Sequence, residues 1–265
     1  MVRIALGVEY AGDSFEGWQS QSHGRTVQDV LEAAIGGIAG HPVRLHCAGR
    51  TDAGVHATVQ VCHFDTPAHR SETAWRRGVN SMLPPSVAVR WSSPVSDAFH
   101  ARFTAAGRRY RYVLYNDPVR PALLAGRVGW HHAPLEVQPM CEAAARLVGE
   151  HDFSAFRAAG CQARSPVKTL HSVQLQREGA YLLFDFHANA FLHHMVRNLV
   201  GALVYVGLGR RPPEWIDELL HSGDRRHAGP TFAAQGLYLC GVDYPGDWPL
   251  PGGGRIIRLP NFPAV

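Results

Sequence analysis

The same order of secondary-structure elements is expected twice along this chain of 265 residues. In the first half, alternating apolar and polar residues indicate strands, and apolar residues at helical spacing indicate helices. A capping box that begins at Thr26 sets the start of the first helix, and Pro84 ends the second. The expected elements are a strand at 3–10, a helix from Thr26, strands at about 43–48 and 57–65, a helix from Ser71, and a strand at 87–91.

The second half follows the same strand–helix–strand–strand–helix–strand order. Its expected elements are a strand at about 106–115, a helix through 137–148, strands at about 169–176 and 181–187, an apolar helix at 191–208, a short helix after Pro213, and a strand at about 236–243. Each half therefore predicts a ferredoxin-like subdomain.

We expect an α+β fold in which the two βαββαβ subdomains join into one extended, mainly antiparallel sheet with helices packed on it. The N-terminal half is expected at 1–104 and the C-terminal half at 105–244. A tail rich in proline and glycine at 245–265 cannot continue a sheet.

Composition is compatible with a partner that carries phosphate groups. The formal net charge is +4, and Lys168 is the single lysine among 26 basic residues. The other 25 are arginines, which bind phosphate bidentately and stack on bases, although each basic cluster could also be a solvated face.

Cysteine usage and hydropathy indicate the compartment. Five scattered cysteines without a CxxC pair argue against a disulfide framework and a structural zinc site. The opening segment is too short and too polar for a signal peptide, and the apolar stretch at 191–208 carries histidine and arginine side chains. We therefore expect a cytoplasmic protein that does not enter a membrane.

The loop between the second and third expected strands carries Arg50, Thr51, Asp52 and His56, with glycines that permit close backbone approaches. A carboxylate in such a loop can act as a nucleophile. The alternative is an ordinary turn, in which Asp52 accepts from backbone amides and Arg50 points into water. Residue spacing alone leaves both interpretations open.

The expected strand at 106–115 is basic and aromatic. Its alternation places Tyr110 and Tyr112 on one face and Arg109 on the other. Tyrosines on a sheet face can fill a core, or they can form a platform on which a base stacks while the phenol moves a proton. Arg108 and Arg109 can contact RNA phosphates or remain solvated.

The expected helix at 191–208 is apolar nearly all round and carries Arg197 in its middle. A buried guanidinium needs a carboxylate partner, which is Asp52 or a structural acid such as Asp185. His193 and His194 raise the question of a metal site. Adjacent helical positions point about 100° apart and no HExxH spacing occurs, so we expect no metal.

Residues 49–57 resemble the catalytic signature of the TruA-type tRNA pseudouridine synthases over a long ungapped match. The Arg-x-Tyr sequence that ends at Tyr110 and the Phe-Leu-x-x-Met-Val-Arg sequence that ends at Arg197 resemble motifs of the same family. Shorter matches keep the family's order over residues 1–244 and lie at 12–21, 26–28, 99–103 and 151–156.

Residues 230–239 resemble the family's closing motif, in which Leu237 would place an apolar side chain in the uridine pocket. Two positions depart from the pattern. Phe232 stands where alanine is usual, and Ala234 stands near the usual position of proline. Leu237 could equally be a core residue.

The resemblance implies isomerisation of uridine to pseudouridine at positions 38, 39 and 40 of the tRNA anticodon stem-loop. The reaction replaces a C–N bond by a C–C bond without a redox step, so no cofactor is expected. Asp52 is implied as the nucleophile, which attacks the base or the sugar. Tyr110 would stack on the uracil, and Arg197 would hold Asp52 ionised.

Further residues are implied to bind the substrate. Arg50 would occupy the space left by the flipped nucleotide. His56, Arg108 and Arg109 join Leu237 among the expected substrate-binding residues, with His56 mainly supporting the loop. The family works as a homodimer, so the expected partners are tRNA and a second copy of this chain.

Two other classes of protein stay open. A non-catalytic protein that binds or folds tRNA would use the same basic surface without needing Asp52. A hydrolase with an aspartate nucleophile would normally need a second acid in the same loop or a metal site, and neither is visible in the sequence.

Overall fold

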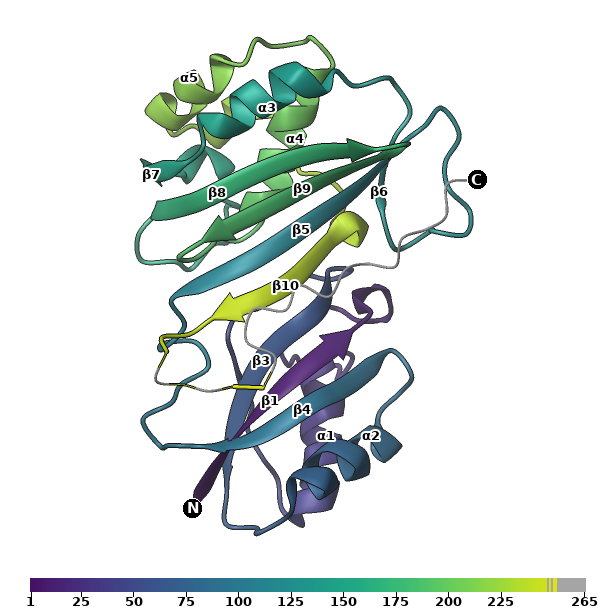
Figure 1. Ribbon diagram of the computed structural model, residues 1–265, viewed down its shortest axis with the longest axis vertical. Coiled ribbons are helices and arrows are strands. Elements are labelled where there is room, and N and C mark those ends of the chain that lie inside the picture. The colour runs from purple at the N-terminus through teal and green to yellow at the C-terminus, as the bar shows by residue number, and fades with distance from the viewer. Residues whose placement is uncertain (247, 249, 252–265) are drawn as a thin grey trace. The chain divides into compact units, whose positions relative to one another are not determined.

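The computed structural model describes residues 1–246, 248 and 250–251. Its internal contacts divide it into two compact units (Figure 1). The first contains Met1–Gly107 and the described chain from Tyr238, and the second is Arg108–Leu237. Residues 247, 249 and 252–265 of the expected tail lie outside the described residues.

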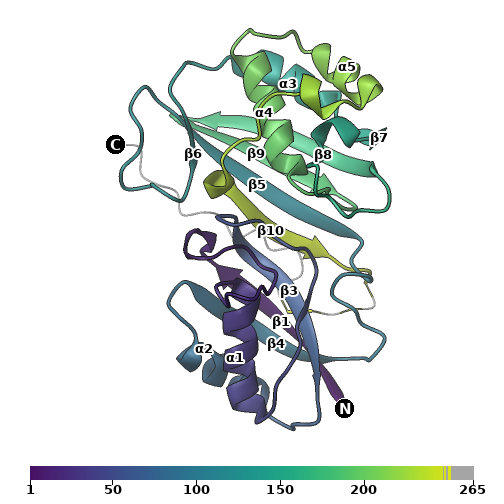
Figure 2. The ribbon, with the colours of Figure 1, turned by 180° about the vertical axis from the view of Figure 1, so that it is seen from behind.

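The first unit is a sheet whose one face is covered by α1 and α2 (Figure 2). β1 is antiparallel to β3 on one side and to β4 on the other. β2 pairs with β3, and β10 runs parallel to β3. Its elements are β1 (Val2–Tyr10), η1 (Gly12–Ser14), α1 (Val27–Ala39), β2 (His46–Cys47), β3 (His56–Thr66), the π-helix η2 (Ala74–Gly78), α2 (Val79–Met82), β4 (Val87–Val95) and β10 (Leu237–Asp243).

The start of α1 confirms the predicted capping box. The Thr26 side chain accepts from the Asp29 N–H, and the Asp29 carboxylate accepts from the Thr26 N–H at 3.2 Å. The helix ends at Gly40, whose φ of 80° lies in the left-handed region. Leu31 and Ile35, four residues apart on one helical face, are fully buried.

Both faces of the first unit's sheet carry buried side chains. Alternation along β1 sends Leu6 to one face and Ala5 to the other. Ala5 belongs to a buried cluster with Val61, Phe99 and Ala101. This cluster anchors the turn that follows β4 against the sheet.

The second unit is also a sheet with helices, and α4 lies against the face that Figure 2 presents. β9 is antiparallel to β5 and to β8, β8 is antiparallel to β7, and β6 runs parallel to β5. Its elements are β5 (Gly107–Asn116), β6 (Gly129–His131), α3 (Val137–Ala145), β7 (Gly149–Asp152), η3 (Ser154–Phe156), β8 (Val167–Glu178), β9 (Tyr181–Ala188), α4 (Met195–Gly207), α5 (Trp215–Ser222), η4 (Arg225–His227) and η5 (Ala234–Gly236).

The α+β class and the mainly antiparallel pairing are confirmed, with local differences. The strand expected at 43–48 shortens to His46–Cys47 because the Leu45 N–H donates to Glu32 of α1 instead of to a neighbouring strand. The helix expected from Ser71 contains a π-helical turn before α2. Strands β6 and β7 were not predicted, since three and four residues are too few for a pattern.

The end of the second half also differs from the expected layout. Tyr238 and Leu239 of β10 pair with His56 and Ala57 of β3. By its contacts β10 is therefore grouped with the first unit, whereas the sequence assigned it to the second half. The first segment of unit 1 ends at Gly107, whereas the sequence predicted that the N-terminal half ends at residue 104.

The five cysteines are free thiols in the structure. In the part of the chain that the structure describes, no helix has both the length and the apolar character needed to cross a membrane.

Three histidines of the first unit lie close together. The His63 ring lies 5.1 Å from that of His46 and 4.7 Å from that of His100, and its Nδ1 accepts from the Ala101 N–H at 3.2 Å. Burial lowers the pKa of His63 to about 4, and the charges of His100 and Arg3 act in the same direction.

We expect acid to destabilise the protein through His63. Its pKa is about 4 in the folded chain and ordinarily 6.5, so the unfolded chain binds more protons between these values. The contribution of neutral His63 to the free energy of unfolding is present above pH 6.5 and is lost as the pH falls toward 4. Urea denaturation at pH 7.5 and pH 5 should show about 1–2 kcal/mol lower stability at pH 5.

His63→Asn provides the control, because asparagine keeps an acceptor for the Ala101 N–H and does not titrate. In this variant the loss between pH 7.5 and pH 5 should shrink by about half or more. An unchanged pH dependence would assign the effect to another group that titrates in this range, such as His100, whose pKa is lowered by burial.

Candidate active site

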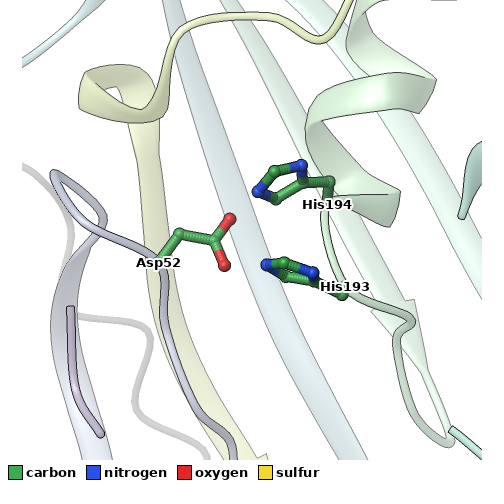
Figure 3. A group of neighbouring side chains, drawn as sticks. All are labelled: Asp52, His193 and His194. Carbon is green, nitrogen blue, oxygen red and sulfur yellow. The ribbon is translucent and has the colours of Figure 1, made fainter. Parts of the chain in front are cut away.

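Asp52 lies on the loop between β2 and β3 in the first unit (Figure 3). Its carbonyl accepts from the Val55 N–H at 3.1 Å, which closes a turn in which Gly54 has a φ of 81°. Thr51 and Val55 are buried on either side, whereas the Asp52 side chain is partly exposed and Arg50 is exposed. The loop therefore presents a carboxylate and a guanidinium on an anchored backbone.

The segment that follows β1 holds this loop in place. The Tyr10 hydroxyl lies 2.7 Å from Thr51 Oγ1, and the Trp18 N–H donates to the Thr51 carbonyl at 3.0 Å. Gly17 has a φ of 87°, and a Cβ at this position would lie 2.9 Å from the Thr51 carbonyl oxygen. The matching segment at 12–21 thus acts as the scaffold of the Asp52 loop.

His56 supports the loop from the other end. It is 2% exposed, its Nδ1 accepts from the Gly12 N–H at 3.0 Å, and its ring stacks on Tyr238 with centroids 4.7 Å apart. These contacts favour the supporting role expected for His56 over direct contact with a substrate.

Gly12→Ala tests how much the Asp52 loop depends on this scaffold. A Cβ at position 12 would lie 1.9 Å from the Val55 carbonyl oxygen, which is backbone and cannot rotate away. We expect a loss of about 1–3 kcal/mol in unfolding free energy and a clear loss of activity, because the loop must shift. Chemical denaturation and an activity assay measure the two effects.

Gly160→Ala is the matched control, since a Cβ there meets no atom within 4 Å. It should leave the unfolding free energy within about 0.5 kcal/mol of the parent value. If Gly12→Ala and Gly160→Ala changed the unfolding free energy equally, the close contact between position 12 and the Val55 carbonyl would have no effect on stability.

Tyr110 lies on β5, in the second unit, as the alternation predicts. It is 9% exposed, and the Phe191 ring meets it edge-on with centroids 5.0 Å apart and planes at 81°. Phe191 therefore fixes the orientation of this tyrosine. Phe191 begins the motif that ends at Arg197, but the sequence alone indicates no role for it.

The arginines of β5 lie in different surroundings. Arg108 is 9% exposed and donates to the Asn189 carbonyl at 2.9 Å, whereas Arg109 is partly exposed. Arg111 binds both carboxylate oxygens of Asp185 on β9, each at 2.7 Å. Because Arg111 engages Asp185, the interpretation in which that acid serves Arg197 is not favoured.

Arg197 lies on the first turn of α4, where the chain at 230–233 passes close to the helix. Its Nε donates to the Phe232 carbonyl at 2.8 Å, and the Phe232 N–H donates to the Arg197 carbonyl at 3.1 Å. The Phe232 ring meets Tyr112 edge-on at 5.8 Å. The departure from alanine at position 232 therefore has a structural consequence, since its ring packs against β5.

Tyr112 lies next to this arginine. It is fully buried, and its hydroxyl donates to the Ala233 carbonyl at 2.9 Å. Burial raises the pKa of Tyr112 far above its ordinary value, opposed by the positive charge of Arg197. Tyr112 is therefore a neutral hydrogen-bond donor that holds the segment bearing Phe232.

A partly buried polar network beside Arg197 holds the same segment. Arg225 donates to Asn198 Oδ1 and Thr231 Oγ1, both at 3.1 Å, and to the Gly229 carbonyl at 2.8 Å. The Thr231 hydroxyl donates to Asn198 Oδ1 at 2.6 Å. A Cβ at Gly201 would lie 2.0 Å from the Pro230 carbonyl, so the helix and the segment touch through backbone.

His193 and His194 precede α4 instead of belonging to it (Figure 3). His194 has a φ of 62°, in the left-handed region, so the helix begins at Met195 and not at residue 191. Their ring centroids lie 4.1 Å apart. The helical argument against a shared metal was therefore wrong, and the expected absence of a metal stays a prediction.

Leu237 ends the second unit and is 5% exposed. The preceding Gly236 packs on β5, since a Cβ there would lie 2.6 Å from the Val113 carbonyl oxygen and from the Tyr112 ring. This burial fits a core residue. Its role as a wall of a uridine pocket stays a prediction.

Comparison with known proteins identifies the family. The family model described as tRNA pseudouridine synthase matches residues 7–104 and 143–245. These ranges contain Asp52, Arg197 and the segment around Phe232, whereas Tyr110 lies between them.

Curated relatives match over nearly the whole chain. A protein of Aromatoleum aromaticum named tRNA pseudouridine synthase A is 67% identical over 264 residues and covers 100% of both chains. Proteins of the same name from Dechloromonas aromatica and Methylobacillus flagellatus are 62% and 57% identical, over 94% and 97% of this chain and 95% and 99% of their own. The chain belongs to the tRNA pseudouridine synthase family.

Proposed function

We propose that this protein isomerises uridine to pseudouridine in tRNA, at positions 38, 39 and 40 of the anticodon stem-loop. Membership of the family supports the reaction and the class of RNA. The observation that carries the proposal is the Asp52 loop, in which buried neighbours and close-packed glycines hold a partly exposed carboxylate. The positions in tRNA follow from the resemblance of residues 49–57 to the TruA-type signature.

The isomerisation of uridine needs few catalytic side chains. The N-glycosidic bond of uridine breaks, a C–C bond forms between the same sugar carbon and C5 of uracil, and a proton leaves C5 while N1 gains one. Oxidation state and atoms balance without a cofactor. Asp52 acts as the nucleophile toward the base or the sugar, and a fixed carboxylate suits this role.

The remaining residues bind and orient the nucleotide. Tyr110, whose orientation Phe191 fixes, stacks on the uracil and can move the proton. Arg197, whose Nε donates to the Phe232 carbonyl, is the countercharge that the family resemblance implies for Asp52. Arg50 is exposed and occupies the place of the flipped base, and Leu237 lines the uridine pocket.

The purified protein and an unmodified tRNA transcript test this function. We expect stoichiometric pseudouridine at whichever of positions 38, 39 and 40 carries uridine, and none in a transcript with cytidine at these positions. Binding without pseudouridine would contradict the proposal and favour the non-catalytic tRNA-binding alternative.

We also propose that the protein acts as a homodimer in the cytoplasm. The resemblance to a dimeric family and the free cysteines support this assignment. Light scattering of the purified chain at micromolar concentration should give twice the mass of 29.1 kDa.

A further inference from the structure

The turn between β4 and β5 carries an exposed aromatic side chain. Phe103 is 75% exposed, whereas Phe99, four residues earlier, is fully buried. A single exposed apolar residue is common on protein surfaces and has no meaning by itself. The surroundings of Phe103 make it unusual.

The backbone of this turn is fixed by side chains from several elements. The Thr104 N–H and hydroxyl both donate to the His100 carbonyl, at 3.0 and 2.7 Å. The His63 ring accepts from Ala101, and Arg3 donates to the Phe99 carbonyl at 2.7 Å. The Phe103 ring is thus presented on a pre-organised turn, so little ordering would be needed on binding.

The neighbours of the exposed ring are aromatic and basic. The His100 ring packs on Phe103 with centroids 4.3 Å apart, and the Arg102 guanidinium lies 5.6 Å from the Phe103 centroid. His100 Nδ1 accepts from the N–H groups of Arg102 and Phe103, which holds the imidazole in place. Arg102 itself is exposed.

We propose that Phe103 and Arg102 form a stacking site for an unpaired nucleotide of the RNA, separate from the Asp52 loop. An exposed ring offers a π-face to any base, and the adjacent guanidinium attracts the phosphate. A protein partner would need about 800 Å² of complementary surface with an apolar centre. One ring beside an exposed arginine fits a nucleotide better.

The proposed stacking site and the Asp52 loop belong to the same unit. His100 also contacts His46 of β2, with ring centroids 5.5 Å apart. Asp52 follows His46 by six residues in the same unit, which bounds the chain path at about 22 Å. The ring contacts from His46 through His100 to Phe103 add to this path, and an RNA bound at Asp52 would span the whole of it to stack a nucleotide on Phe103. The inference rests on the proposed RNA substrate but not on catalysis.

Binding of an unmodified tRNA transcript to the full chain tests the site. Phe103→Ala should raise the Kd by about 5- to 50-fold through loss of stacking, whereas Phe103→Trp should keep it within about 2-fold. Arg102→Ala should raise the Kd and reduce the slope of log Kd against log salt by about one. Met82→Ala, at another exposed apolar residue of the same unit, should bind as the parent does.

The outcomes separate this inference from the proposed function. A Phe103→Ala protein that binds tRNA as the parent does, or a Phe103→Trp protein as weak as the alanine variant, overturns the stacking site. A change of oligomeric state with unchanged Kd also overturns it, because that result assigns Phe103 to a protein contact. If the parent binds tRNA through Phe103 but makes no pseudouridine, the stacking site stands and the proposed function fails.

Discussion

Replacing Arg197 by methionine is expected to lower the rate of pseudouridine formation at saturating tRNA by at least ~100-fold. Methionine keeps an unbranched side chain at this partly exposed position and removes the positive charge that is proposed to act on Asp52. The loss should appear in the rate of the chemical step and only weakly in the Kd for tRNA, since the arginine is proposed to act on Asp52 and not on the phosphates.

Arg197→Lys should not rescue the activity. The Arg197 Nε donates to the Phe232 carbonyl, which leaves the rest of the guanidinium for a second partner. The three N–H donors of lysine sit on a single nitrogen, so lysine cannot reproduce the fixed spacing between the Nε and the terminal nitrogens of a guanidinium. We expect the lysine variant to remain at least ~10-fold below the parent rate.

Single-turnover assays with enzyme in excess measure these rates directly. Arg146→Met is the matched control, because Arg146 forms an ion pair with Glu214 at 2.7 Å in the same unit and has no proposed role in catalysis. It should react at the parent rate. An Arg197→Met protein with more than a tenth of the parent rate would remove Arg197 from the mechanism.

Features set by short-range physics were predictable from the sequence. The capping box at Thr26 depends on residues three apart, and it is present. The alternation of β5 correctly placed Tyr110 and Tyr112 on its buried face. The Asp52 loop was also located between two strands, because its glycines and the flanking alternation are local signals.

Features set by tertiary contacts were not predictable. Two hydrogen bonds join Arg197 to Phe232, and a further hydrogen bond joins Arg225 to Asn198. Both pairs connect residues about 30 positions apart, and no local sequence pattern encodes them. The left-handed backbone at His194 shortened α4, although the residues from 191 onward continue an apolar helical pattern. Gly12 was visible as a motif residue, but its contact with Val55 required the fold.

Asp52→Asn is expected to have the largest effect on activity. Asparagine has nearly the same shape as aspartate, so the loop held by Tyr10, Trp18 and Gly17 should keep its structure. The amide is neutral and is a poor nucleophile, so the rate should fall by at least ~1,000-fold. Affinity for tRNA should be retained, since the basic and aromatic surface is unchanged.

Asp217→Asn makes the same change at an exposed carboxylate of α5 that pairs with Arg146. It controls for the loss of a negative charge and should retain the parent rate. Asp52→Glu adds a comparison in which the charge is kept but displaced by one methylene, and partial activity is expected. Urea denaturation of each variant separates loss of folding from loss of chemistry.

The assignment of Asp52 as the nucleophile of a tRNA pseudouridine synthase is the proposal on which the mechanism depends. Its most direct test is the amount of pseudouridine formed when Asp52→Asn, folded and in excess, is incubated with an unmodified tRNA transcript. We predict tRNA binding equal to that of the parent and no pseudouridine over the time in which the parent completes the reaction. Pseudouridine formed by the variant at the parent rate would contradict the claim.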